Sequence, residues 1–239
     1  MSESDLLQVV YKDEYLVVID KPSGLLVHRS WLASDAKRFA MQMLRDQLGQ
    51  RVYPVHRLDR PTSGLLIFAL SSEIARALNE QFAERDIKKV YHAVVRGYVD
   101  DAGIIDYALK EEHDKIADKQ AQADKPAQEA VTEYQCVARV ELPFKVSKKH
   151  DTSRYSLVKL MPLTGRKHQL RRHMSHIRHP IIGDTRHGEG RHNRFFREHF
   201  DCHRLLLAST AIEFQHPKTG KLLSVEIEVP EILSRPFVR

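Results

Sequence analysis

The stretch that most constrains the fold runs from residue 54 to residue 70 and reads PVHRLDRPTSGLLIFAL. Pro61 disfavours helical backbone at the residue before it, and Gly64 can take a positive φ without steric cost. Residues 65–70 are apolar without interruption, which is typical of a buried strand. The sequence therefore predicts a constrained loop that carries Asp59 and leads directly into the core.

This loop has two interpretations. Asp is common in turns, so Asp59 can be a surface turn residue that pairs with Arg57 and Arg60. A loop that rigid elements hold in place is also a common way to present a reactive carboxylate. Local chemistry alone favours the surface turn, and the choice depends on the rest of the chain.

The composition is that of a soluble globular protein. With 239 residues, of which 42% are hydrophobic and 29% charged, the chain suits one large domain or two closely joined lobes. No apolar run approaches the roughly 20 residues that span a bilayer, and the polar start MSESDLLQ is unlike a signal peptide. The two cysteines, Cys136 and Cys202, form no CxxC pair, which favours a reducing, cytoplasmic location.

The chain carries a formal net charge of +6 and 14 histidines. A basic surplus of this size suits a polyanionic partner. Because many proteins without such a partner are also basic, the charge by itself does not decide the function.

Apolar and turn patterns predict an α+β (mixed α/β) fold. Strands are expected at residues 8–11, 15–19, 65–70, 91–99, 130–140, 155–161, 212–214 and 222–229. Helices are expected at residues 33–48, after Ser71 or Ser72, at 167–178 and at 190–200. The elements lack a strict βαβ rhythm, so we expect a central mixed, largely antiparallel sheet with flanking helices. Residues 110–128 are charged and rich in alanine, which predicts a long exposed excursion.

Four ordered segments carry a family resemblance. They are DKPSGLLVH at 20–28, HRLDRPTSG at 56–64, KVYHAVVRG at 89–97 and TGRKHQLRRHMSHIRHPIIGD at 164–184. Together they resemble the signatures of the RluA family of pseudouridine synthases, isomerases that convert uridine to pseudouridine in structured RNA. The resemblance implies one catalytic domain over residues 1–239, with a cleft between two lobes and without the N-terminal S4-type RNA-binding domain of many relatives.

The resemblance also implies three catalytic residues. Asp59 would be the nucleophile, and a carboxylate can form a covalent intermediate that divides one hard step into easier ones. Arg166 would keep Asp59 ionised, because a guanidinium stays charged and can hold a carboxylate with two hydrogen bonds. Tyr91 would stack on the uracil and help move a proton, although a Tyr on a Val-rich strand also suits plain core packing. The reaction needs no cofactor, since there is no net redox change.

A uridine in folded RNA must first leave its stack. The resemblance implies that Arg57 or His56 fills the space that the base leaves, and we favour Arg57 because a guanidinium can both stack and bind phosphate. Arg60 is assigned phosphate contact. Further candidates for RNA contact are Arg171, in the fourth segment, and the stripe Arg191, Arg194 and Arg197, which recurs every third residue and is equally compatible with a solvated helix face.

Two other functional classes remain open. Crowded histidines (His168, His173, His176 and His179) could serve a metal-dependent hydrolase, but the chain has no HExxH motif, and the interleaved Lys and Arg residues repel a cation, so we expect no metal. The second alternative is a non-catalytic RNA-binding protein with the same fold.

The substrate is inferred from one segment. Residues 187–197 (HGEGRHNRFFR) are longer than expected for the general family and resemble the bacterial branch that modifies uridine 65 of tRNA. The predicted partner is therefore tRNA, with ribosomal RNA as the alternative. We expect a monomer that does not bind membranes.

Overall fold

The computed structural model describes residues 6–28, 38–111 and 126–238. The chain divides into two compact units, called here unit 1 and unit 2. Among the described residues, unit 1 comprises 6–28, 38–89 and 211–227, and unit 2 comprises 90–111, 126–210 and 228–238. The strand ladders within each unit are antiparallel, which confirms the predicted mixed α+β fold with a largely antiparallel sheet.

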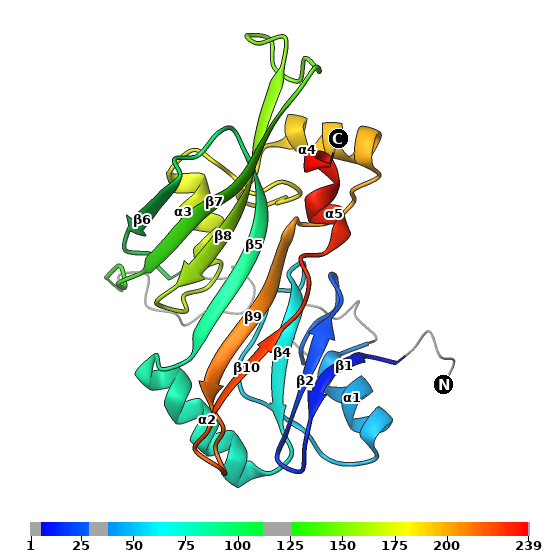
Figure 1. Ribbon diagram of the computed structural model, residues 1–239, viewed down its shortest axis with the longest axis vertical. Coiled ribbons are helices and arrows are strands. Elements are labelled where there is room, and N and C mark those ends of the chain that lie inside the picture. Colours follow the sequence, from blue (N-terminus) through cyan, green and yellow to red (C-terminus); the bar gives the residue numbers. More distant parts are fainter. Residues whose placement is uncertain (1–5, 29–37, 112–125, 239) are drawn as a thin grey trace. The chain divides into compact units, whose positions relative to one another are not determined.

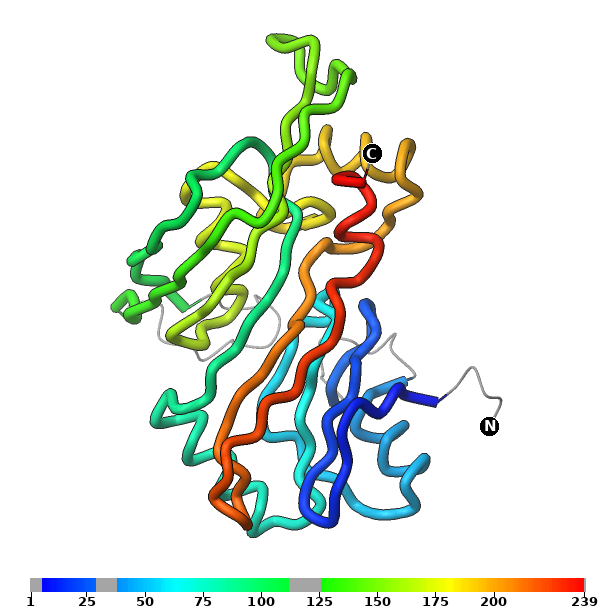
Figure 2. Tube along the Cα trace, in the orientation of Figure 1, coloured from blue at the N-terminus to red at the C-terminus, as the bar shows by residue number. Residues whose placement is uncertain are grey.

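Unit 1 contains a ladder of three strands, β1 (Gln8–Lys12), β2 (Leu16–Lys21) and β4 (Ser63–Ala69), which lie side by side in Figure 2. The short β3 (Tyr53–Pro54) pairs with β4, and β10 (Leu222–Glu226) pairs with the end of β9 (Leu207–Gln215). Every residue of β4 is buried, as the apolar run predicts.

The turn between β1 and β2 depends on Asp13. Its carboxylate accepts hydrogen bonds from the backbone N–H groups of Tyr15, at 2.7 Å, and Leu16, at 2.8 Å. The same carboxylate contacts Nε2 of His216, at 2.8 Å, in the turn before β10. Burial opposes ionisation, but these hydrogen bonds hold the pKa of Asp13 below its usual value. Asp13 therefore fixes this turn and also joins it to the turn before β10, near the other end of unit 1.

Two of the described helices belong to unit 1. α2 (Ser72–Glu84) begins as predicted, because the Ser71 hydroxyl accepts a hydrogen bond from the Ile74 N–H at 3.2 Å. α1 (Ala40–Leu48) ends as predicted at Gly49, which has a φ of 65°. The predicted start at residue 33 falls outside the described residues, and Phe39 has extended backbone.

In the described part of unit 2, consecutive strands of the sheet are β5 (Lys88–Arg96), β8 (Ser153–Pro162), β7 (Val131–Leu142) and β6 (Ala102–Asp106), and the first part of β9 lies beside β5. Figure 1 shows β7 and β8 as a long hairpin. The helices are α3 (Gln169–His176), α4 (Gly190–Phe200), α5 (Glu231–Ser234) and the 3₁₀ helix η2 (Arg235–Phe237). None of the described helices is long and apolar enough to cross a bilayer.

Several predicted boundaries in unit 2 were wrong. The strand predicted to reach residue 99 ends at Arg96, because Gly97 takes a φ of 84° and the His179 ring lies where a larger side chain would point. The helix predicted over residues 167–178 begins only at Gln169, after His168 with a φ of 56°. Strand β6 was not predicted. The centre of the excursion at 110–128 lies outside the described residues.

Candidate active site

The Asp59 loop is fixed by the turn at residues 22–25, within unit 1. The Gly24 N–H donates to the Arg60 carbonyl at 2.8 Å, and the Ser23 hydroxyl donates to the Pro61 carbonyl at 2.6 Å. Asp59 itself is half-buried. Hydrogen bonds between residues 36 and 38 positions apart therefore join two segments of the resemblance into one structure around the predicted nucleophile.

Lys21 holds these two segments together from inside. It is fully buried, and its ammonium donates to the carbonyls of Pro22 at 2.9 Å, Leu25 at 2.8 Å and Arg60 at 3.3 Å. A buried ammonium is costly unless hydrogen bonds compensate it, and these carbonyls supply them. The sequence singled out Lys21 by resemblance only, without a role, and the structure shows that it supports the Asp59 loop.

His56 anchors the loop to the core strand. Its Nε2 accepts a hydrogen bond from the Ile67 N–H at 3.0 Å, and its ring stacks on Phe82 with centroids 4.8 Å apart. Burial, and then the positive charge of Lys89, lower the pKa of His56 to about 3, so the ring is neutral. With this anchoring position, His56 is poorly suited to move into RNA.

Arg57 and Arg60 lie on the exposed side of the same loop. Arg60 donates through Nε to the Gly24 carbonyl at 3.1 Å, so part of its guanidinium is used within the protein. Arg57 forms no hydrogen bond or ion pair with any part of the chain that the structure describes. This difference favours Arg57 over His56 and Arg60 as the side chain that enters RNA.

Tyr91 and Arg166 belong to unit 2. Tyr91 lies opposite Leu160 in the β5–β8 ladder and packs against the apolar cluster around Ala93 and Val158. Arg166 is half-buried in the turn between β8 and α3, where its Nε donates to the Glu129 carbonyl at 3.0 Å. Asp59 is in unit 1, whereas these two residues are in unit 2. The meeting of all three side chains in a cleft between two lobes therefore stays a prediction.

Arg171 was predicted to contact RNA, and its position argues against this role. It is buried, and its Nε and Nη2 donate to the two carboxylate oxygens of Asp184 at 2.7 and 2.8 Å. Asp184 also accepts the backbone N–H groups of Arg186 and His187, each at 2.9 Å. Burial opposes ionisation, but Arg171 and these amides lower the pKa of Asp184. We therefore remove Arg171 from the residues proposed to bind RNA.

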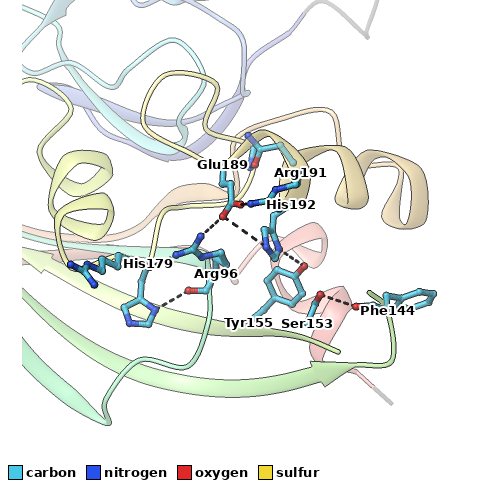
Figure 3. Close-up of polar contacts among 11 residues, drawn as sticks. Arg96, Phe144, Ser153, Tyr155, His179, Glu189, Arg191 and His192 are labelled. Atoms are coloured by element: carbon cyan, nitrogen blue, oxygen red, sulfur yellow. Dashed lines mark hydrogen bonds and ion pairs between the residues drawn. The ribbon is translucent and has the colours of Figure 1, made fainter. Parts of the chain in front are cut away.

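Helix α4 has the predicted bounds and is anchored by polar contacts (Figure 3). Glu189, which precedes the helix, forms an ion pair with Arg96 of β5 and another with Arg191. Nδ1 of His192 lies 2.8 Å from the hydroxyl of Tyr155 on β8. Burial raises the pKa of Tyr155 and lowers that of His192, so both side chains are neutral. The helix is therefore fixed to the sheet of unit 2.

The outward face of α4 carries the predicted arginine stripe. Arg191, Arg194 and Arg197 are exposed, whereas Phe195 and Phe196 are buried. Arg191 pairs with the glutamate described above, but Arg194 and Arg197 form no ion pair with the described residues. Two uncompensated cations on a rigid helix are available for phosphate groups, and contact with RNA stays a prediction.

The crowded histidines have other partners. His173 contacts the Thr132 hydroxyl and the Tyr107 carbonyl, each at 3.0 Å, and His179 contacts the Arg96 carbonyl at 2.8 Å. No group of three or more His, Cys, Asp or Glu side chains in the described residues could hold a metal ion.

Comparison with known proteins identifies the class. Residues 15–176 match the model of the RNA pseudouridylate synthase family, and the chain belongs to this family. It is 54% identical over 233 residues to tRNA pseudouridine synthase C of Vibrio parahaemolyticus, covering 98% of this chain and 94% of that one. It is 56% identical over 227 residues to the protein of the same name from Vibrio cholerae, covering 95% and 93%. The predicted family is thus confirmed.

A solved structure supports the fold. The human RNA Pseudouridylate Synthase Domain Containing 1 superposes with a TM-score of 0.74, covering 99% of this chain and 88% of the human one. At 24% identity this likeness shows the fold alone.

Proposed function

We propose that the chain isomerises uridine to pseudouridine in tRNA. The observation that carries the proposal is the 54–56% identity, over nearly the whole chain, to proteins named tRNA pseudouridine synthase C. The single RNA pseudouridine synthase domain would act in the cytoplasm as a monomer. Its net charge of +6 suits this polyanionic substrate.

The chemistry is assigned to Asp59. The reaction breaks the bond between uracil and ribose, turns the base and joins it again through carbon. A covalent intermediate with the Asp59 carboxylate, on the sugar or on the base, would carry the substrate between these steps. The tight hydrogen bonding of its loop to the 22–25 turn supports this assignment, because a nucleophile must be held in position.

Three further side chains would assist Asp59. Arg166 would keep the carboxylate ionised, and Tyr91 would stack on the uracil and help move a proton. Arg57, exposed next to the nucleophile, would occupy the place of the extruded base. Arg60, Arg191, Arg194 and Arg197 would contact phosphates.

The target position is proposed to be uridine 65. The supporting feature is the segment 187–197, which includes most of α4 and distinguishes this chain from the general family pattern. Ribosomal RNA is the alternative substrate. Mapping pseudouridine in total RNA from a deletion strain tests the assignment: loss at tRNA position 65 is expected, and loss confined to ribosomal RNA would overturn it.

The catalytic proposal predicts that Asp59→Ala abolishes turnover while RNA binding stays nearly intact. Tritium released from uracil-labelled tRNA measures the reaction, and filter binding measures affinity. Asp46→Asn, which changes an exposed carboxylate on α1, is the matched control and should leave both values unchanged. Full turnover by Asp59→Ala would end the proposal, and a wild-type protein that binds RNA without converting uridine would indicate the non-catalytic alternative.

A further inference from the structure

The buried amide of Gln169, the first residue of α3, uses all of its hydrogen-bonding capacity around Arg166. Its Oε1 accepts the backbone N–H of Arg166 at 3.0 Å and the hydroxyl of Thr164 at 2.7 Å. Its Nε2 donates to the carbonyl of Val131 and to the hydroxyl of Thr132, each at 3.0 Å. A neutral amide offers two donors and two acceptor positions, so the site is saturated.

The orientation of this amide follows from its backbone partners. The Arg166 N–H can only donate and the Val131 carbonyl can only accept, so only one of the two amide orientations satisfies both. Gln169 therefore joins the Arg166 turn to the start of β7 in a fixed direction. The Thr164 hydroxyl reinforces the joint, because its oxygen also accepts the Val131 N–H at 3.0 Å.

A second layer of side chains supports Gln169. Nε2 of buried His173 faces the Tyr107 carbonyl and must donate to it, which leaves Nδ1 of the neutral ring as an acceptor. Burial lowers the pKa of His173, which favours this neutral form. The Thr132 hydroxyl, 3.0 Å from Nδ1, therefore donates to His173 and accepts from Gln169. The hydrogen bonds form one directed chain from Gln169 to the Tyr107 carbonyl.

The hydrogen bonds of Arg166 constrain its backbone and its Nε but leave the two Nη groups of its guanidinium for another partner. Its backbone N–H is held by Gln169, its carbonyl accepts the Gln169 N–H at 3.0 Å, and its Nε is held by the Glu129 carbonyl. Neither Nη group is used in a hydrogen bond within the part of the chain that the structure describes. The backbone and the stem of the side chain are thus constrained, while the planar donor pair is not used.

We propose that Gln169 is the positioning residue for Arg166: its saturated amide fixes the turn from which the guanidinium acts on the nucleophile. The proposal rests on the function assigned above, because it presupposes that Arg166 acts in catalysis. It goes beyond a general role in folding, since it predicts loss of the chemical step itself. A misplacement of about 1 Å at a catalytic group can cost about 100-fold in rate.

The test compares Gln169→Leu, which has similar size and no hydrogen bonds, with the wild type. We expect kcat on tRNA to fall about 100-fold with KM nearly unchanged. Thr132→Val keeps the volume and removes one of the four Gln169 bonds together with the bond from Thr132 to His173, and it should lower kcat by a smaller factor. This second variant decides the question if Gln169→Leu does not fold.

The matched control is Gln47→Leu. The Gln47 amide bridges the backbone N–H and carbonyl of Leu7 at 2.8 and 3.0 Å, in unit 1 and on α1. Its loss removes partly buried amide hydrogen bonds far along the chain from Arg166. We expect a lower melting temperature and an unchanged kcat for the folded protein.

A double-mutant cycle separates positioning from general stability. If Gln169 acts through Arg166, Gln169→Leu adds little to the loss that Arg166→Lys already causes. Provided that Arg166→Lys is itself impaired, two results would overturn the inference alone. One is a loss of kcat in the double variant that equals the product of the two single losses. The other is a kcat of Gln169→Leu within about twofold of wild type. Full activity of Arg166→Lys would instead refute the catalytic role of Arg166 and the inference with it.

Discussion

The side chain of Arg171 is charged and yet buried, and no local pattern in the sequence indicates this. Its exposed fraction is 6% and that of its partner Asp184 is 1%. Asp184 also accepts hydrogen bonds from the backbone N–H groups of residues 186 and 187, so the pair closes the connection between α3 and α4. A cation inside a basic motif is thus part of the architecture, and its burial argues against contact with RNA.

Arg171→Ala is predicted to destabilise the protein by about 3–5 kcal/mol, because it leaves a buried carboxylate without its partner. Urea unfolding followed by circular dichroism measures this change. The salt dependence of tRNA binding should not change, since no phosphate contact is lost. A stability within about 0.5 kcal/mol of wild type, combined with a reduced salt dependence, would return Arg171 to the RNA-contacting residues.

At the scale of one element, α4 combines a buried aromatic face with an exposed basic one. Its bounds could be predicted because the relevant pattern is local: Phe196 and Phe200 recur at helical spacing, and their rings lie 5.0 Å apart. The orientation of α4 could not be predicted from local patterns, because it depends on the ion pair of Glu189 with Arg96, and these residues are 93 positions apart. Together these contacts present Arg194 and Arg197 on a rigid support.

The double variant Arg194→Ala/Arg197→Ala should reduce the slope of log K against log salt by about 1.8, the value for two lost phosphate contacts. KM for tRNA should rise, and kcat at saturating tRNA should stay the same. Affinity measured from 50 to 200 mM salt gives the slope. Arg76→Ala, an exposed arginine on α2, is the control and should leave it unchanged. An unchanged slope in the double variant would show that the exposed face of α4 contacts solvent and does not bind phosphate groups.

For the whole molecule, the titratable groups predict acid lability. Burial lowers the pKa of His56, His173 and His192 below the ordinary 6.5, so the stability that they contribute is present above pH 6.5 and is lost as the pH falls below it. Asp184 and Glu189 also have lowered pKa values. Their contribution is present above the ordinary carboxyl range and is lost as the pH falls through their folded pKa values.

The urea midpoint should therefore fall steadily as the pH is lowered from 7 to 4. His56→Gln, which keeps an oxygen to accept the Ile67 N–H but does not titrate, should flatten the part of the curve below pH 6.5. His203→Gln, on an exposed side chain, should leave the curve unchanged. A midpoint that rises on acidification would contradict this account.

Much of the fold could be predicted from the chain, and the exceptions have a common cause. The Asp13 turn and the Ser71 cap use partners within three residues, so local patterns reveal them. Strand β6 could not be found, because it depends on pairing with β7: Gly103 lies opposite Tyr134, whose ring occupies the space of a side chain. The site residues were reached by resemblance, and the supports Lys21 and Gln169 emerge only from contacts between distant segments.

The order of the segments also bears on synthesis. Unit 1 takes residues from both parts of the chain, since β10 pairs with the end of β9 after unit 2 has largely been made. A nascent polypeptide therefore cannot complete unit 1 until residues 211–227 have been made. Premature termination anywhere before residue 211 leaves unit 1 without its last two strand segments, however intact the Asp59 loop is.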